Sequence, residues 1–217
     1  MAGINKATIG KVVAVAQQKG GSGKTMLVAQ LGVALAEAGA RVAVLDTDPQ
    51  ASLTLWARLR ATAPKASATL VCATTSGWRL SAELDRLRGA HDIVLIDTPP
   101  VIDSDARRAI RAAELVVIPL NPSPPDLWAA EGTIRLAAEE KRQVALVFNR
   151  APAASRLRKR LEAEIAARGL PLLEPALANR AGYANSFADG LGITEAGPAT
   201  AAAEELRALA AALRERL

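Results

Sequence analysis

The chain has 217 residues, of which 50% are apolar and 23% are charged, a composition typical of a globular protein with one substantial core. Its net charge of +5 is a mild excess that is compatible with binding to a polyanion without being evidence for it. The single cysteine, Cys72, excludes an internal disulfide framework and paired thiolate ligands, and we expect it to be a small buried hydrophobe. Neither a signal peptide nor an apolar stretch of spanning length is found, so a cytoplasmic protein without a membrane partner is expected.

Short β-branched apolar segments alternate along the chain with alanine- and leucine-rich segments of helical length. The predicted strands are 12–16, 41–45, 68–72, 93–96, 115–119 and 144–148. The predicted helices are 25–38, 51–60, 78–88, 104–113, 127–140, 154–168 and 199–217. Apolar runs without alternation are typical of strands buried on both faces of a parallel sheet. The sequence therefore predicts one α/β domain over residues 1–217, doubly wound, with a mostly parallel sheet, helices on both faces and a short N-terminal extension (1–11).

The segment AQQKGGSGKTM (16–26) lies between the first predicted strand and the first predicted helix. It resembles the phosphate-binding pattern G-x-x-x-x-G-K-[ST], but Gln18 stands where the first glycine is expected. A second lysine, Lys19, lies inside the loop. A flexible turn with incidental lysines is the alternative, and the strand–loop–helix context disfavours it.

The second half of this segment has the residue types that hold a nucleotide phosphate. Its glycines let the backbone turn tightly and direct N–H groups toward a phosphate at a helix N-terminus. Lys24 is placed to reach the β- and γ-phosphates, and the Thr25 hydroxyl is placed to bind Mg²⁺. The sequence therefore predicts a nucleotide bound together with Mg²⁺.

Carboxylates follow two other predicted strands. Asp46 and Asp48 follow the second strand in VAVLDTDPQ, and Asp97 ends the strand in DIVLIDTPP. Ligands of open α/β sheets bind at the carboxyl ends of strands, where such groups can orient a water or hold Mg²⁺. The alternative for each is ordinary turn or helix-capping chemistry.

Together KGGSGKT, LDTDPQ and IDTPP resemble the deviant Walker-A P-loop ATPases of the ParA/MinD superfamily, and VVIPLNPSPPDLWA (116–129) is similar to a segment of partition ATPases. The short, ParF-like ParA proteins are the most similar group. This resemblance implies an ATPase whose hydrolysis is slow and stimulated by a partner. It also implies a dimer that forms on ATP binding, with Lys19 reaching the nucleotide of the other subunit.

Site residues follow from the resemblance, residue by residue. The implied catalytic residues are Lys19, Lys24 and Asp46. The implied nucleotide-binding residues are Gly20, Gly21, Ser22, Gly23, Lys24, Thr25, Met26 and Asn149, the last as an adenine contact. The implied metal-binding residues are Thr25, Asp46 and Asp97.

A basic run on the sixth predicted helix is the candidate surface for nonspecific DNA. The candidate residues are Arg150, Arg156, Arg158, Lys159, Arg160 and Arg180. A solvated amphipathic helix explains the same residues equally well.

The resulting hypothesis is a nucleoid-associated ATPase that segregates or positions a cargo, most simply a plasmid or chromosome, with a ParB-like or equivalent adaptor. One alternative is ParA-like positioning of a protein cargo such as chemotaxis clusters or carboxysomes. Others are a MinD-like membrane-associated ATPase, a small-molecule ligase of the dethiobiotin or cobyrinate type, and a scaffold with vestigial hydrolysis. The alanine-rich final helix disfavours the MinD-like alternative, because a membrane-binding helix needs bulky apolar residues and a basic face.

Overall fold

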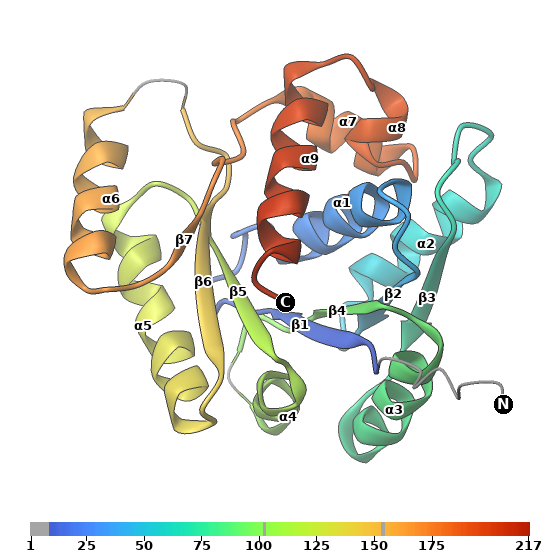
Figure 1. Ribbon diagram of the computed structural model, residues 1–217, viewed down its shortest axis with the longest axis horizontal. Helices are drawn as coiled ribbons and strands as arrows, with labels where there is room; N and C mark the ends of the chain where they lie inside the picture. The colour runs from blue at the N-terminus through green and yellow to red at the C-terminus, as the bar shows by residue number, and fades with distance from the viewer. Residues whose placement is uncertain (1–8, 102, 153–154) are drawn as a thin grey trace, which may run out of the picture.

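The computed structural model describes residues 9–101, 103–152 and 155–217. Within these residues seven strands form one parallel sheet in the order β3-β2-β4-β1-β5-β6-β7. The strands are β1 (Lys11–Val15), β2 (Val42–Asp46), β3 (Leu70–Thr74), β4 (Ile93–Asp97), β5 (Leu115–Leu120), β6 (Gln143–Phe148) and β7 (Leu172–Leu173). The helices are α1 (Lys24–Glu37), α2 (Ser52–Thr62), α3 (Leu80–Ala90), α4 (Ser104–Ala112), α5 (Pro124–Glu139), α6 (Arg156–Ala167), α7 (Ala181–Ala188), α8 (Ile193–Ala196) and α9 (Ala201–Arg214). The predicted doubly wound α/β fold is confirmed (Figure 1).

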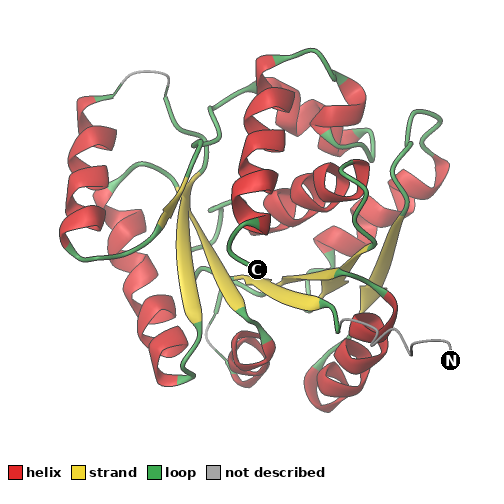
Figure 2. Cartoon of the chain, in the orientation of Figure 1, coloured by secondary structure: helices red, strands yellow, loops and turns green. Residues whose placement is uncertain are grey.

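Helices cover both faces of the sheet (Figure 2). One face packs against α1, α2 and α7–α9, and the other packs against α3–α6. Successive strand residues point to opposite faces, so Val13 and Val15 of β1 contact the first set of helices while Val12 and Ala14 contact the second. Burial from both sides explains why the strands appear in the sequence as continuous apolar runs.

Strand β3 is the exception, because it lies at one edge of the sheet. Val71 is 37% exposed, and Cys72 is an exposed residue as well. The prediction that Cys72 is a buried hydrophobe is therefore wrong. The residues around Cys72 are as apolar as those of a central strand. Whether a strand is central or at the edge depends on pairing between distant segments, which local composition does not reveal.

Helix α5 begins at Pro124, three residues before the predicted start at Leu127. Ser123 is its N-cap, and the Ser123 hydroxyl accepts a hydrogen bond from the backbone N–H of Asp126. Proline is tolerated in the first turn of a helix, where its missing N–H has no intrahelical partner to lose. The other predicted boundaries differ by a few residues at most, and the predicted helix start at residue 154 and residues 1–8 lie outside the described residues.

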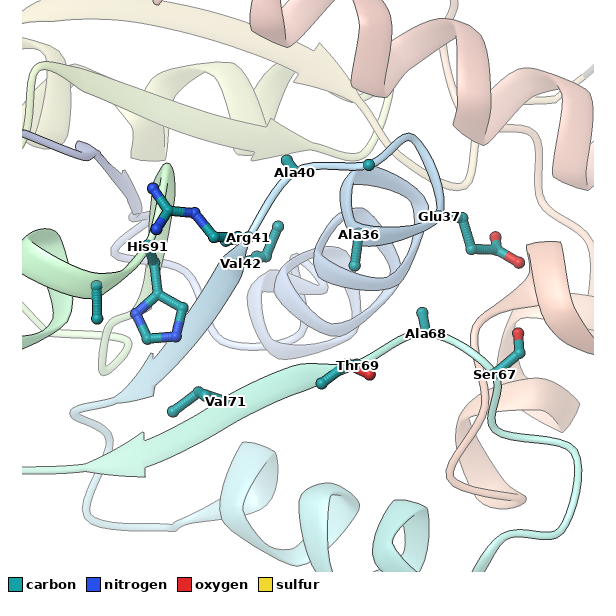
Figure 3. A pocket seen from close by; sticks show the side chains of 12 residues that line it. Ala36, Glu37, Ala40, Arg41, Val42, Ser67, Ala68, Thr69, Val71 and His91 are labelled. Carbon is teal, nitrogen blue, oxygen red and sulfur yellow. The ribbon is translucent and has the colours of Figure 1, made fainter. Parts of the chain in front are cut away.

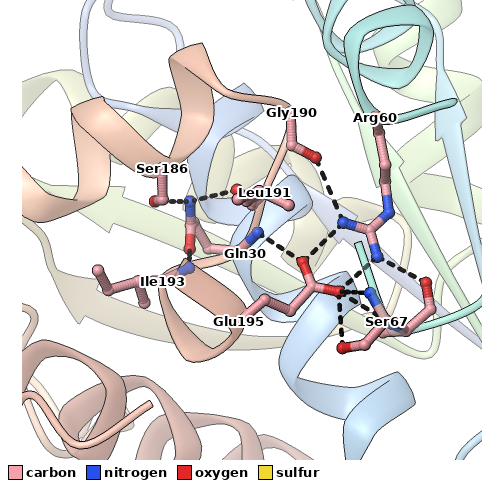
Figure 4. Close-up of polar contacts among 10 residues, drawn as sticks. Gln30, Arg60, Ser67, Ser186, Gly190, Leu191, Ile193 and Glu195 are labelled. Atoms are coloured by element: carbon pink, nitrogen blue, oxygen red, sulfur yellow. Dashed lines mark hydrogen bonds and ion pairs between the residues drawn. The ribbon is translucent and has the colours of Figure 1, made fainter. Parts of the chain in front are cut away.

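The turn-rich segment after α6 forms β7, α7 and α8, none of which the sequence pattern predicted. Polar contacts attach α7, α8 and the loop between them to the rest of the fold (Figure 4). The Gln30 amide of α1 donates to the Ser186 hydroxyl at 3.1 Å and accepts from the Ile193 N–H at 2.7 Å. Elements of one or two turns have too little periodicity to be recognised and take their conformation from such contacts.

A buried ion pair makes the second attachment. Both terminal guanidinium nitrogens of Arg60 on α2 donate to the Glu195 carboxylate of α8 at 2.8 Å, and both side chains are buried. Burial raises the pKa of Glu195, but the Arg60 bonds and backbone N–H donors outweigh it and lower the pKa to about 2. Two of those donors belong to Ser67 and Ala68, so one carboxylate joins α2, α8 and the loop before β3.

Candidate functional site

The carboxyl ends of β1, β2 and β4 meet at one edge of the sheet. Asp97 ends β4 and is the register partner of Asp46 on one side and Val15 on the other. The Thr47 hydroxyl donates to the Asp97 carbonyl at 2.7 Å, and the Thr98 hydroxyl donates to the Val15 carbonyl at 2.9 Å. The loops that leave these strands therefore start from fixed positions, at the edge where open α/β sheets bind ligands.

The loop from residue 16 to residue 23 connects β1 to α1 through two left-handed glycines. Gly21 has φ 78° and Gly23 has φ 89°, a conformation that glycine adopts without steric cost. Gly23 directly precedes α1, and no side chain of the described residues caps this helix. The first N–H groups of α1 are therefore free to bind an anion.

Lys24 is the first residue of α1 and is only 7% exposed. Burial lowers the pKa of its ammonium group, and the nearby carboxylates of Asp97 and Asp48 oppose that shift. A phosphate at the helix N-terminus would give this cation the partner that it lacks among the described residues. Met26 differs from its neighbours, since its side chain packs against the hydrophobic core and leaves only its backbone near the loop.

Asp97 is fully buried, and neither carboxylate oxygen has a hydrogen-bond partner among the described residues. Burial raises its pKa to about 7, and the Asp46 carboxylate adds to the shift. The Thr25 hydroxyl, near this carboxylate but outside hydrogen-bond geometry, and the Lys24 charge oppose it. An unpartnered buried carboxylate beside a hydroxyl fits Mg²⁺, a hard cation that takes oxygen ligands. Among the described residues no group of three or more His, Cys, Asp or Glu side chains could hold a metal ion. Mg²⁺ is usually bound through one or two carboxylates together with water and substrate phosphates.

Asp46 differs from Asp97 in that both of its oxygens are engaged. One oxygen accepts the Asp48 N–H at 3.1 Å, and the other accepts the N–H and the hydroxyl of Thr54, each at 2.8 Å. These bonds fix the carboxylate at the end of β2 and leave acceptor capacity for a water. Asp46 is therefore better suited to orienting a water, and Asp97 to holding a metal.

Lys19 pairs within its own chain with Asp126 of α5. The Lys19 ammonium lies 2.5 Å from the Asp126 carboxylate, which also accepts from the Asn121 amide and the Ser123 hydroxyl. Burial raises the Asp126 pKa, but the bonds from Lys19, Ser123 and Asn121 outweigh it and lower the pKa overall. The sequence reasoning missed Asp126, although the S-x-x-D spacing of Ser123 and Asp126 is a helix-start signal that could have identified it.

Asn149 and Arg150 follow β6 and both contact the loop. The Asn149 amide donates to the Ser22 carbonyl at 3.0 Å, and the Arg150 guanidinium donates to the Gly21 carbonyl at 3.2 Å. A Cβ on Gly23 would collide with the Asn149 amide, so the glycine also permits this close approach. Arg150 therefore belongs to the loop environment, apart from the basic helix with which it was grouped.

The remaining candidate DNA-binding residues divide into two groups. Arg158 pairs with Glu162 on α6, and Arg180 pairs with Glu205 on α9. The exposed cations of α6 that have no ion pair in the described part of the chain are Arg156, Lys159 and Arg160. The structure thus leaves a smaller cationic surface than the sequence suggested.

Large apolar side chains are exposed near the same edge of the sheet. Trp128 lies two residues after Asp126 and is 65% exposed, and Val101, shortly after β4, is 54% exposed. Trp78, after the end of β3, is 80% exposed.

A separate hollow of about 490 Å³ lies at the amino ends of the strands, where β2 and β3 begin (Figure 3). Arg41 and His91 contribute to its wall, and the Arg41 guanidinium is already paired with Asp92 at 2.6 Å. The sheet separates this hollow from the glycine loop, so it is not part of the site described above.

Known proteins with similar sequences bear on the identity of this site. "Protein ParA" of Rhizobium radiobacter is 32% identical over 218 residues, which cover 95% of this chain and 97% of that protein. "Maintenance of carboxysome distribution protein A" of Halothiobacillus neapolitanus is 29% identical over 191 residues, which cover 85% of this chain and 87% of that protein. Both matches extend over most of each chain.

A solved structure shares the fold. Cobyrinic acid a,c-diamide synthase from Mycobacterium smegmatis, with a bound ATP analogue and magnesium, superposes with a TM-score of 0.76 at 24% identity, covering 95% of each chain. The family model for the CobQ/CobB/MinD/ParA nucleotide binding domain matches residues 13–193, which include the glycine loop, Asp46, Asp97 and Asn149. The chain therefore belongs to the ParA/MinD family of nucleotide-binding domains.

Proposed function

We propose that the chain is a ParA-type ATPase that binds ATP with Mg²⁺, dimerises in its ATP-bound state and positions a cargo on DNA. The observation that supports this most directly is the pairing of an uncapped helix N-terminus with the unpartnered Asp97 carboxylate at one sheet edge. The first binds phosphate and the second binds Mg²⁺, and a magnesium nucleotide supplies both groups. Lys24, buried between them, neutralises phosphate charge.

Hydrolysis in this proposal depends on two further groups. Asp46, held by Thr54 and the Asp48 N–H, orients the attacking water. Lys19 stabilises charge on the phosphates, as a cation supplied from outside the ordinary loop does in phosphoryl transfer. The Lys19 side chain is 42% exposed despite its pairing with Asp126, so it is accessible to a second subunit.

The proposed DNA-binding residues are Arg156, Lys159 and Arg160 on α6, which would contact DNA of any sequence. A dimer doubles this cationic surface, and phosphate contacts need only charge and reach. The cargo is proposed to be a plasmid or chromosome, because other relatives are named as chromosome- and plasmid-partitioning ParA proteins, and a ParB-like adaptor is proposed to attach it. Positioning of a protein assembly is the second candidate, supported by the similarity to the carboxysome distribution protein.

A MinD-like mode of membrane attachment is disfavoured by the packing of the last helix. Leu206, Leu209 and Leu213 of α9 are buried in the core that includes α1. These are the bulky residues that a membrane-binding helix would expose. In the described structure no helix has the length and apolar character needed to cross a bilayer.

The test combines nucleotide, oligomer and DNA measurements on the purified chain. A fluorescent ATP analogue with Mg²⁺ should bind to the wild type and not to Lys24→Ala, and light scattering should detect a dimer only with ATP. DNA affinity, measured by fluorescence anisotropy with a random-sequence duplex, should rise with ATP and fall in Lys159→Ala/Arg160→Ala. Arg111→Ala is the matched control, because that exposed arginine is on α4 and already paired with Glu140. If ATP changes neither the oligomeric state nor DNA affinity, the proposal is wrong.

A further inference from the structure

Gln18, which replaces the first glycine of the ordinary phosphate-loop pattern, lies against α5. A Cβ built on Gly132 would lie 2.6 Å from Cδ and 2.7 Å from Oε1 of Gln18, and closer still to its Nε2. The whole Gln18 amide therefore occupies the space beside the Gly132 α-carbon. No hydrogen bond from this amide is found among the described residues, so the contact is one of packing.

Gly132 lies in the interior of α5, where glycine is a poor helix former. Its φ angle is not among the positive values of the chain, so the helix does not need glycine for its backbone conformation. The Gln18 amide is the neighbour that a larger side chain would meet. The glycine is thus explained by the space that Gln18 occupies.

The residues on either side of Gln18 also contact α5. The Gln17 amide donates to the Asp126 carbonyl at 3.4 Å, and Lys19 pairs with the Asp126 carboxylate. Three consecutive loop residues therefore contact one helix, two at its first turn and Gln18 at Gly132, about 9 Å further along the axis for six residues at 1.5 Å each. The contacts at Asp126 and at Gly132 together fix the direction of the loop segment along the helix. With only one of these contacts, the segment could still pivot about it.

We propose that Gln18 is a positioning residue that seats the first half of the phosphate loop on α5 through Gly132. The seat fixes the direction in which Lys19 leaves the loop, while the second half of the loop, from Gly20 to Thr25, cradles the phosphates. A glycine at position 18 would leave the first half without this anchor. This inference rests on the proposed ATPase function, and it assigns the substitution in the loop to the orientation of the second lysine.

The variant Gly132→Ala tests the seat, because its methyl group displaces the Gln18 amide while alanine favours the helix. We expect kcat for ATP hydrolysis to fall about tenfold, since misplacement of a positioned group by ~1 Å can cost up to about 100-fold. The KM for ATP should change by less than about threefold, because the second half of the loop provides ground-state binding. The thermal midpoint should stay the same or rise.

Three further variants separate the seat from general effects on the helix. Gln18→Met keeps the length of the side chain and should retain near-wild-type kcat. The double variant Gln18→Ala/Gly132→Ala should match Gln18→Ala alone, because the collision disappears with the amide, whereas independent effects would multiply. Gly89→Ala is the matched control, since this glycine near the end of α3 has open space around its α-carbon.

The outcomes distinguish the two proposals. If the wild type hydrolyses ATP and Gly132→Ala has an unchanged kcat, the proposed positioning role of Gln18 is wrong. The ATPase proposal is not affected by that result. Multiplicative losses in the double variant also overturn the seat. A wild-type chain that binds no ATP overturns the ATPase proposal itself.

Discussion

Lys19 and Asp126 form an ion pair in which the lysine side chain is 42% exposed and the carboxylate only 1% exposed. The carboxylate is held by donors from Asn121 and Ser123, so the lysine is the mobile partner. A lysine that must act on the nucleotide of another subunit has to leave this carboxylate first. The pair therefore competes with the proposed contact between subunits.

Replacing Asp126 by asparagine should release Lys19 and strengthen the ATP-dependent dimer. The dissociation constant of the dimer should fall about 3- to 10-fold. The reason is that the apparent affinity of a site increases with the fraction of molecules in the conformation that can bind. Analytical ultracentrifugation with ATP and Mg²⁺ measures this change. Glu131→Gln, which removes a carboxylate of α5 that pairs with Arg168, is the control. A dimer of unchanged or lower affinity in Asp126→Asn would contradict the competition.

Asp97 should make the nucleotide-free protein less stable as the pH rises. Its pKa is about 7 in the folded chain, compared with about 3.9 when unfolded, so the native state binds the extra proton between these values. The free energy of unfolding should therefore decrease from about pH 4 to about pH 7, by up to about 4 kcal/mol for this group. Asp97→Asn should remove this dependence, as urea denaturation at pH 5 and pH 8 would report. Equal pH dependence in both proteins would contradict the assignment.

The buried Arg60–Glu195 pair should be essential for the last third of the fold. Glu195→Gln leaves the Arg60 charge buried without a partner, and it should lower the free energy of unfolding by about 3–5 kcal/mol. Asp92→Asn breaks the exposed pair with Arg41 and should cost far less, because solvent screens these two charges. Chemical denaturation of the two variants gives the comparison.

The same pair predicts a response to acid. The Glu195 pKa of about 2 lies below the unfolded value of about 4.3, so its contribution is fully present above the unfolded value. That contribution should be lost as the pH falls from about 4 to about 2, and Glu195→Gln should lack this part of the acid transition. Circular dichroism during acid titration measures the difference.

Asn149 should contribute equally to the binding of different nucleotides, because it holds the backbone of the phosphate loop. Its amide holds the Ser22 carbonyl, and Asn149→Ala should weaken binding about tenfold, the equivalent of one hydrogen bond of about 1.4 kcal/mol. A residue that only holds the loop affects ATP and GTP equally, whereas an adenine contact affects ATP alone. We expect equal losses, measured by competition against a fluorescent nucleotide.

The central strands and long helices were predictable because each repeats one physical signal many times. Strand β4 is apolar up to its last residue, Asp97, because helices cover both of its faces, and α1 is a long segment rich in alanine and leucine. The exposure of Cys72 was not predictable, because strand order depends on pairing between distant segments. The short helix α8 was missed because four residues hold too little periodicity.

The candidate site divides in the same way. The sequence could propose Lys24, Thr25 and Asp97 as site residues because each has a fixed place relative to the end of a strand. Asp126 lies 107 residues from its partner Lys19, and only the fold brings the two together. Gly132 was equally hidden, since a glycine within a helix has no recognisable role until the side chain lying against it is known.

The arrangement of the three tryptophans provides an optical reporter. Trp56 is 1% exposed and stacked on Phe187, so its emission should stay constant, whereas Trp128, in the first half of α5, is 65% exposed. A second subunit arriving at this edge would shield the exposed indole and shift its fluorescence to shorter wavelength. The unlabelled protein would then report the proposed association, and Trp128→Phe and Trp78→Phe would assign the signal, because Trp78 is exposed as well.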